Sequence, residues 1–226
     1  MKIKGGGMKL LDLFCGAGGA SMGYHLAGFE VVGVDINPQK RYPFEFHQAD
    51  AMSFPLEGFD AIHASPPCQA YSQLKGLTTG DFQKLINSIR DRIIASGVPF
   101  YIIENVAGAK DVLINPIRLC GSSFGLGVWR HRFFEISWGE LKPPVCQHDR
   151  CPLPLDVTGT GGPQKTARIK PGGGLSRKPK SMKQASAAMG IEWMTRKEIV
   201  ESIPPAYTKW IGLQLIEMLR GTDKNN

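Results

Sequence analysis

A cysteine that directly follows two prolines is the first candidate for chemistry in this chain of 226 residues. In the stretch SPPCQAYS, Pro66 and Pro67 fix the backbone φ angle and keep the preceding chain extended, so Cys68 starts its loop in a preset direction. A thiolate held in this way can serve as a nucleophile. A free cysteine is more often a small buried hydrophobic residue, and the stretch taken alone favours that interpretation.

An acidic residue and two arginines further along the chain could take part in the same chemistry. Glu104 ends the apolar run VPFYII, and burial there would raise its pKa as a proton donor requires, unless backbone N–H groups satisfy the carboxylate. Arg130 and Arg132, in WRHRF, are two residues apart, so on a strand both would point to one face. Their guanidinium groups could bind one substrate, or they could be ordinary surface charge.

A glycine-rich turn, in DLFCGAGGAS, stands between an apolar run and a helical pattern. Glycines allow a tight turn and let a ligand approach the backbone, and the start of the helix offers free N–H groups to an anion. Asp35 ends the next apolar run, FEVVGVD, where it can accept hydrogen bonds from ribose hydroxyls. Together these features favour an adenosine-type cofactor over a purely structural turn.

The elements that must position these residues are short apolar runs that predict strands. Runs of this length bounded by Gly, Asp or Pro are typical of parallel strands covered on both faces. A helix capped by Asp81 is expected after the fourth run. The alternation predicts an α/β fold with a doubly wound sheet, whose binding crevice lies at the carboxyl ends of the strands. The expected strands are residues 8–14, 29–35, 44–50, 59–65, 98–106 and 132–138.

Positive charge is concentrated in one segment. The formal net charge is +7, and from Lys142 to Lys183 nine Lys and Arg face two Asp, so the rest of the chain sums to zero. The segment is also rich in Gly and Pro, which predicts a basic loop facing a polyanion, or simply a solvated loop. The expected divisions are a catalytic and cofactor-binding domain over residues 1–140, a basic segment over 141–180 and C-terminal helices over 181–226 that pack back on the catalytic domain.

Helical signals return near the C-terminus. Ser181 with Gln184, and Thr195 with Glu198, have the spacing of a capping box. Residues 207–219 then show an amphipathic pattern, which predicts a last helix.

The cysteines and the N-terminus bear on the cellular compartment. There is no run of about 18 apolar residues and no signal-peptide pattern, so a soluble protein of the cytoplasm with reduced thiols is expected. Cys146, His148 and Cys151 are zinc-type ligands, with Cys120 as a candidate fourth. Their spacing matches no strong zinc signature, so reduced cysteines and no metal are expected.

Taken in order, DLFCGAGG, SPPCQAYS, IIENV and WRHRF resemble the motif series of the DNA cytosine-5 methyltransferases. The resemblance runs from about Leu10 to Ile136 and resumes from Ser181 to Leu219. It implies a mostly parallel, Rossmann-like sheet of the S-adenosylmethionine-dependent methyltransferase type, with a small irregular basic appendage. The implied partner is double-stranded DNA in a bacterial, archaeal or phage-infected cell, and a monomer is expected.

The resemblance also implies roles for individual residues. Cys68 would be the nucleophile that adds to cytosine C6, and Glu104 would hydrogen-bond or protonate the ring at N3. Arg130 and Arg132 would act near the base O2 and the catalytic loop. The implied cofactor residues are Phe14, Gly16, Gly18, Gly19, Asp35 at the ribose, Asp50 at the adenine, Pro67 and Ser202. The expected DNA contacts are Gln69, Ser72, Lys165, Arg168, Lys170, Arg177, Lys178 and Lys180.

The reaction explains why these residue types are needed. Cytosine C5 is a poor nucleophile, so a thiolate must first add at C6, and acidic and cationic groups disperse the charge that develops on the ring. The base must also leave the DNA stack, at a cost of a few kcal/mol. Phosphate contacts by the basic segment would help to offset that cost.

The sequence departs from the family pattern at several places. Val128 stands where a Gln is usual, and Val200 and Glu201 stand where a Gly-Asn pair is usual. About forty residues separate the arginine motif from Ser181, too few for a large target-recognition domain. We therefore expect a short or relaxed recognition sequence, or a helper protein. The alternatives are a non-catalytic relative that binds DNA or the cofactor, and an RNA cytosine-5 methyltransferase of the same fold.

Overall fold

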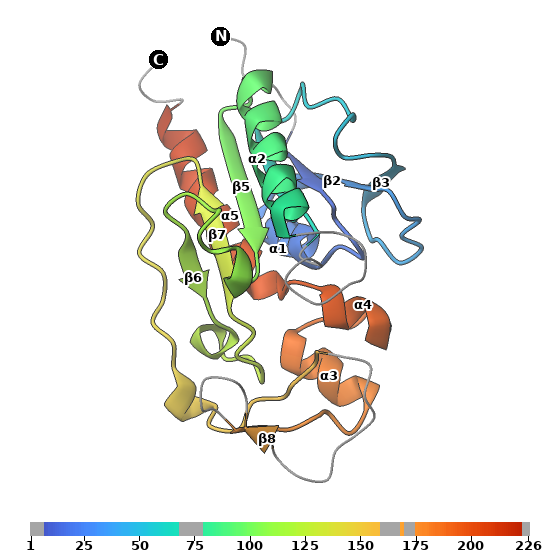
Figure 1. Ribbon diagram of the computed structural model, residues 1–226, viewed down its shortest axis with the longest axis vertical. Helices are drawn as coiled ribbons and strands as arrows, with labels where there is room; N and C mark the ends of the chain where they lie inside the picture. The colour runs from blue at the N-terminus through green and yellow to red at the C-terminus, as the bar shows by residue number, and fades with distance from the viewer. Residues whose placement is uncertain (1–6, 68–78, 159–167, 170–174, 223–226) are drawn as a thin grey trace.

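The computed structural model describes residues 7–67, 79–158, 168–169 and 175–222 (Figure 1). At its centre is a seven-stranded sheet in the order β3-β2-β1-β4-β5-β7-β6. The strands from β3 to β5 run parallel, and β7 is antiparallel to both of its neighbours. Their bounds are β1 Lys9–Leu13, β2 Glu30–Asp35, β3 Glu45–Gln48, β4 Ala61–Ala64, β5 Phe100–Asn105, β6 Ile117–Leu119 and β7 Arg132–Ile136.

The sheet confirms the predicted mostly parallel α/β architecture. Each of the six predicted runs contains a strand, shortened at its ends, because only the paired residues join the ladder. The strand β6 was not predicted, since three residues carry too little pattern to be recognised.

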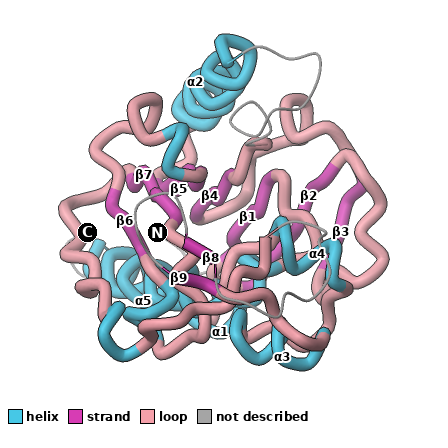
Figure 2. The backbone as a smooth tube through the Cα atoms, turned by 60° about the horizontal axis from the view of Figure 1, so that its bottom comes forward, coloured by secondary structure: helices cyan, strands magenta, loops and turns pink. Residues whose placement is uncertain are grey.

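Helices cover both faces of the sheet (Figure 2). The helix α2, Thr79–Ser96, lies on one face, and α1, Gly19–Ala27, and α5, Pro205–Thr222, lie on the other. The two faces are separate cores because alternate residues of a strand point in opposite directions. Leu10 packs in the core with α1 and α5, whereas Leu11 packs in the core with α2.

The predicted helix starts are largely confirmed. Thr195 and Glu198 form a capping box at α4, Arg196–Glu201, and Ser181 Oγ accepts a hydrogen bond from Gln184 N at α3, Met182–Met189. The start of α2 differs, because the helix begins at Thr79 and Asp81 lies within its first turn. The predicted last helix corresponds to α5.

Small residues let α1 and α5 approach closely. A Cβ atom on Gly23 would lie 2.0 Å from Oγ1 of Thr208, so a larger residue there would force the helices apart. Thr208 Oγ1 also donates a hydrogen bond to the carbonyl of Ala20 at 2.8 Å. This contact anchors the C-terminal helix directly behind the glycine-rich turn.

A third hydrophobic cluster joins the C-terminal helices to the segment after β7. It combines Leu155 and Val157 with Met189 of α3 and Ile199 of α4, and it reaches Ala17 in the glycine-rich turn. Within the described residues, the remaining elements are 3-10 helices and a short antiparallel pair. They are η2 Ala107–Ala109, η3 Gly121–Phe124, η4 His148–Arg150, β8 Arg168–Ile169 and β9 Leu175–Ser176. Within the described ranges, no helix combines the length and apolar character needed to cross a membrane.

Candidate active site

The carboxyl ends of four parallel strands bring the predicted site residues to one edge of the sheet. Leu13 of β1 is paired with both Val34 of β2 and Ala64 of β4, and Ala64 is paired with Ile103 of β5. The next residues along each strand therefore emerge side by side. They include the glycine-rich turn, Asp35, the SPP stretch and Glu104.

The glycine-rich turn is tied to Asp35. Gly16 N donates to Asp35 Oδ2 at 3.0 Å, and Asn37 N donates to Oδ1 of the same carboxylate at 2.8 Å. Phe14 and Gly16 both have positive φ angles, of 60° and 51°. A Cβ atom on Gly16 would meet no atom within 4 Å, so the backbone faces open space at this point. A ligand can approach the peptide groups of the turn there.

The other predicted cofactor residues stand around this turn in different ways. Gly18 has a φ angle of 86° and leads into α1, whereas Gly19 packs so closely on Ser202 that a Cβ would lie 2.1 Å from its Oγ. Asp50 is exposed, and its Oδ1 accepts from Met52 N at 2.9 Å. Pro67 is exposed at the edge of the described segment. Their roles toward a cofactor stay predictions.

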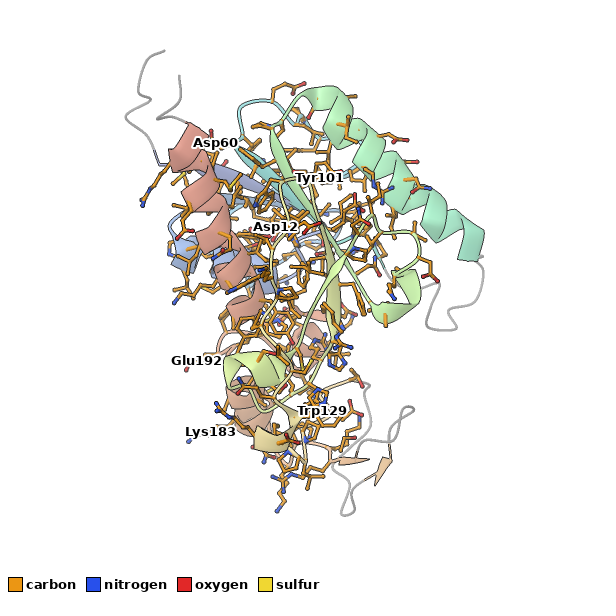
Figure 3. The ribbon with its side chains drawn as sticks, turned by 90° about the vertical axis from the view of Figure 1, so that its left-hand side faces the viewer. Asp12, Asp60, Tyr101, Trp129, Lys183 and Glu192 are labelled. Carbon is orange, nitrogen blue, oxygen red and sulfur yellow. The ribbon has the colours of Figure 1, made fainter. Side chains whose placement is uncertain are left out.

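A buried carboxylate lies under the glycine-rich turn. Ser21 Oγ donates to Asp12 Oδ2, and Tyr42 OH donates to Ser21 Oγ at 2.8 Å. Burial raises the pKa of Asp12 to about 7, although the hydrogen bond from Ser21 opposes that rise. Figure 3 shows Asp12 within the body of the sheet.

Glu104, the last residue but one of β5, is a buried acid paired with an arginine. Its side chain is 7% exposed, and Arg132 Nε lies 2.9 Å from its Oε1. The contact crosses the antiparallel pairing of β5 with β7. Despite that short distance, no donor in the described part of the chain is aligned for a hydrogen bond to Oε1, so the contact is an ion pair. Burial raises the pKa of Glu104, and the charges of Arg132 and Arg130 and a hydrogen bond with Ser65 offset part of the rise.

A series of polar contacts leads from Tyr24 of α1 through β4 to Glu104. Tyr24 OH lies 2.9 Å from Nδ1 of His63, and Nε2 of His63 lies 2.8 Å from Oγ of Ser65, which in turn hydrogen-bonds Glu104. Burial lowers the pKa of His63 to about 3, so the imidazole is neutral. With Glu104 ionised, Ser65 must donate to the carboxylate, which assigns the proton of His63 to Nε2.

The sequence interpretation missed this chain of contacts. His63 is a polar residue in the otherwise apolar strand AIHA, and that anomaly was the available signal. A second missed residue is Asn105, whose Nδ2 donates to the carbonyl of Pro66 at 3.0 Å. This bond joins the ENV motif to the backbone immediately before Cys68.

Arg130 differs from the expectation that it shares a strand face with Arg132. It precedes β7 and has a φ angle of 33°, so its side chain leaves in another direction. Its Nε donates to the carbonyl of Ser202 at 2.8 Å, and its Nη2 donates to that of Val200 at 2.7 Å. Within the described contacts Arg130 holds the C-terminal segment in place, and a role near the base stays a prediction.

The departures from the family pattern have structural consequences. Val128 is buried and packs in the third cluster, so the usual amide is replaced by an apolar contact. Val200 supplies its backbone carbonyl to Arg130, which any residue could do, and Glu201 is exposed. Trp193, which the sequence did not single out, donates from Nε1 to the carbonyl of Ala17 at 2.8 Å.

The predicted DNA contacts are only partly described. Gln69, Ser72, Lys165 and Lys170 lie outside the described residues, as does the predicted nucleophile Cys68, and Arg168 is described only as backbone of β8. Arg177 and Lys180 are exposed. Lys178 is instead 13% exposed, with its Nζ 3.5 Å from Asp156 Oδ2 and donating to the carbonyl of Thr158. The ammonium group of Lys178 is thus paired within the chain, and the roles of all three residues toward DNA stay predictions.

Thiol and imidazole groups gather where β6 ends and β7 begins. Ligand atoms of Cys120, His131, Cys146 and His148 all lie within 4.8 Å of one another. Cys151, which the spacing had suggested, does not belong to this group, and its carbonyl accepts from Trp129 Nε1 at 2.9 Å. His131 was missed because it lies inside the arginine motif, whose residues had been interpreted as binding the substrate.

Comparisons of sequence agree with the motifs. The family model "C-5 cytosine-specific DNA methylase" matches residues 8–112. The chain is 32% identical over 118 residues to Type II methyltransferase M.NgoPII of Neisseria gonorrhoeae, a match that covers 45% of this chain and 34% of that protein. It is 32% identical over 115 residues to Type II methyltransferase M.FnuDI of Fusobacterium nucleatum, covering 45% and 33%. The matches thus span about a third of the length of these curated relatives.

Comparisons of structure extend the likeness to nearly the whole chain. A protein encoded within an E. coli prophage aligns with a TM-score of 0.62 at 16% identity, over 94% of this chain and 99% of that one. The S. pombe Dnmt2 methyltransferase aligns with a TM-score of 0.57 at 15% identity, over 93% and 99%. These likenesses establish an α/β methyltransferase fold. The match over residues 8–112, just under half of this chain, makes that part similar to the C-5 cytosine-specific DNA methylases.

Proposed function

We propose that this protein transfers a methyl group from S-adenosylmethionine to C5 of a flipped-out cytosine in double-stranded DNA, through a covalent bond between Cys68 and C6. The observation that carries the proposal is the buried pair of Glu104 and Arg132, placed beside the SPP stretch that leads into Cys68. A buried acid with a raised pKa next to an arginine can bind a ring nitrogen and its neighbouring carbonyl together.

The glycine-rich turn fits the cofactor. Gly16 leaves the backbone open, and α1 follows directly from Gly18, a cap position with no side-chain hydrogen bond in the described part of the chain. Asp35 is held against the turn and retains lone pairs that can accept hydrogen bonds from ribose hydroxyls. The proposed cofactor residues are completed by Phe14, Gly18, Gly19, Asp50, Pro67 and Ser202. When bound, S-adenosylmethionine supplies an electrophilic methyl group.

The base-binding part assigns distinct tasks to the residues around β5. Cys68 would add to C6 and so make C5 nucleophilic, and it would leave by elimination once the C5 proton has been removed. Glu104 would hold or give a proton at N3, and Arg132 would stabilise the charge that develops toward O2. Asn105 would keep the backbone before Cys68 in place through its bond to Pro66. Arg130 would act as a positioning residue through Ser202.

The basic segment is the proposed contact with DNA. Arg177 and Lys180 are exposed, and the segment from Lys142 to Lys183 carries the whole formal excess of +7. Charges of this kind bind phosphates without reading sequence. Gln69, Ser72, Lys165, Arg168 and Lys170 stay predictions for the same interface.

The test is methyl transfer from radiolabelled S-adenosylmethionine to duplex DNA, with single-stranded RNA as a parallel substrate. The wild-type protein should label cytosine in DNA, and Cys68→Ala should abolish labelling. Cys151→Ala is the matched control, because this cysteine lies away from the strand ends and should retain activity. Labelling of RNA alone, or full activity in Cys68→Ala, would contradict the proposal.

A further inference from the structure

Four potential metal ligands converge where the basic segment meets the sheet. Cys120 directly follows β6, and His131 directly precedes β7, so both are fixed by paired strands. Cys146 lies in the segment after β7, and His148 begins η4. Figure 3 shows neighbouring Trp129 at the end of the molecule that also carries Lys183 and Glu192. Residues separated by up to 28 positions in sequence thus meet at one point.

Two of the distances between the ligand atoms are close to those of a tetrahedral zinc site. Cys120 Sγ lies 3.4 Å from His148 Nε2, and Cys146 Sγ lies 3.6 Å from His131 Nε2. Zinc bonds of about 2.3 Å to sulfur and about 2.0 to 2.1 Å to nitrogen, at tetrahedral angles, separate S and N by about 3.6 Å. All four ligand atoms lie within 4.8 Å of one another, so a single ion can reach them with small adjustments.

Neighbouring contacts hold the ligands in position. The ring of Trp129 stacks on that of His148, with centroids 3.9 Å apart and an angle of 13° between the planes. Ser122 Oγ accepts from Gln147 N at 3.0 Å and lies 3.1 Å from Cys120 Sγ. Ser123 Oγ donates to the carbonyl of Val145 at 2.9 Å. The backbone on both sides of Cys146, at Val145 and Gln147, is therefore bound to η3 independently of any ion.

We propose that Cys120, His131, Cys146 and His148 bind one Zn²⁺ ion in a structural site. Two thiolates and two imidazoles are a preferred set for zinc, and four protein ligands close the coordination sphere, which distinguishes a structural site from a catalytic one. The sequence expectation of no metal, and the candidate set containing Cys151, are replaced by this set.

The bound ion would act as a cross-link between two parts of the chain. It would join the start of the basic segment to the loop between Arg130 and Arg132, because His131 lies between the two arginines. The segment between β7 and α3 is too short to build a large hydrophobic core of its own. A metal cross-link can supply the stability that such a small region otherwise lacks. The proposal does not depend on methyl transfer.

The test measures metal directly in the full chain. Protein reconstituted with Zn²⁺ under reducing conditions and freed of excess metal should hold one equivalent by elemental analysis. Co²⁺ in its place should give the intense visible absorption of a tetrahedral thiolate site. Cys146→Ser and His148→Ala should lose the equivalent, whereas Cys151→Ser, a neighbouring cysteine outside the cluster, should keep it.

The wild-type measurement keeps the proposal open to refutation even if a variant does not fold. Wild-type protein that holds no zinc, or gives octahedral rather than tetrahedral cobalt spectra, would overturn it. So would a full equivalent in folded Cys146→Ser, or a loss in Cys151→Ser that matches the loss in Cys146→Ser. Circular dichroism of each variant identifies the folded ones.

Discussion

The guanidinium of Arg132 lies 2.9 Å from the carboxylate of Glu104, and both side chains are largely buried. The two residues come from adjacent antiparallel strands, so the sheet itself fixes their separation. A buried ion pair of this kind contributes little net stability, because the loss of hydration offsets the attraction. Its value is the placement of an acid and a cation where a flipped base would arrive.

Replacing Glu104 by Gln should reduce methyl transfer by about 10²- to 10⁴-fold, the usual contribution of a positioned acid. The amide keeps the shape of the side chain but cannot give a proton to N3. The rate should be measured with saturating DNA, together with thermal unfolding to verify the fold. A variant with a rate close to that of the wild type would show that Glu104 has no part in the chemistry.

Ser65→Ala should change the pH dependence of the reaction. The hydrogen bond from Ser65 lowers the pKa of Glu104, so its removal should raise that pKa further. The limb of the pH–rate profile that follows Glu104 should therefore move to higher pH, with little change in KM. Tyr24→Phe, two hydrogen bonds further away, should give a smaller displacement. An unchanged limb in Ser65→Ala would contradict the positioning role.

Asp12→Asn should alter how stability depends on pH. The pKa of Asp12 is raised from 3.8 to about 7 in the folded protein, so the folded state binds more protons between these values. The wild type therefore loses stability relative to the variant as the pH rises from about 4 to about 7, by about 1 to 4 kcal/mol in total. His63, with its lowered pKa, has the opposite slope, but it is common to both proteins. Urea unfolding at pH 5 and pH 8 measures the difference, and equal differences at both values would contradict it.

Arg177→Ala and Lys180→Ala should each weaken DNA binding and reduce its dependence on salt, by about one unit in the log–log slope. Lys178→Ala should have a smaller effect on the slope, because its ammonium group is paired with Asp156. Fluorescence anisotropy over a range of salt concentrations separates the three variants. A larger change in Lys178→Ala than in the other two would show that the pairing breaks when DNA binds.

The positions of the main strands along the chain could be predicted because apolar runs between Gly, Asp and Pro are a local signal. The glycine-rich turn, Asp35 and Glu104 were found in the same way, since each follows such a run. The direction of the Arg130 side chain could not be predicted. Its φ angle of 33° places the residue outside the strand, and the identity of the residue does not predict that conformation. Its guanidinium therefore reaches Ser202, which is 72 residues away in sequence.

The contacts that support the site depend on register and on long-range pairing. The series of contacts from Tyr24 through His63 and Ser65 to Glu104 exists because β4 pairs with β5 and α1 packs on the sheet beside them. His131 joins the thiol cluster for a similar reason, since β6 and β7 pair and bring Cys120 to it. Residue types along the chain indicated three of the four cluster residues, but neither His131 nor the contacts from Tyr24 to Glu104 could be predicted from spacing.

The most direct test of the central claim is covalent trapping on a DNA duplex that contains 5-fluorocytosine, in the presence of S-adenosylmethionine. Fluorine at C5 blocks the elimination that would release Cys68, so the enzyme and the DNA should remain joined. The wild type should give a complex that survives denaturing electrophoresis, with the DNA attached to Cys68 in the peptide map. Absence of that complex, or an equal yield in Cys68→Ala, would contradict the proposed reaction.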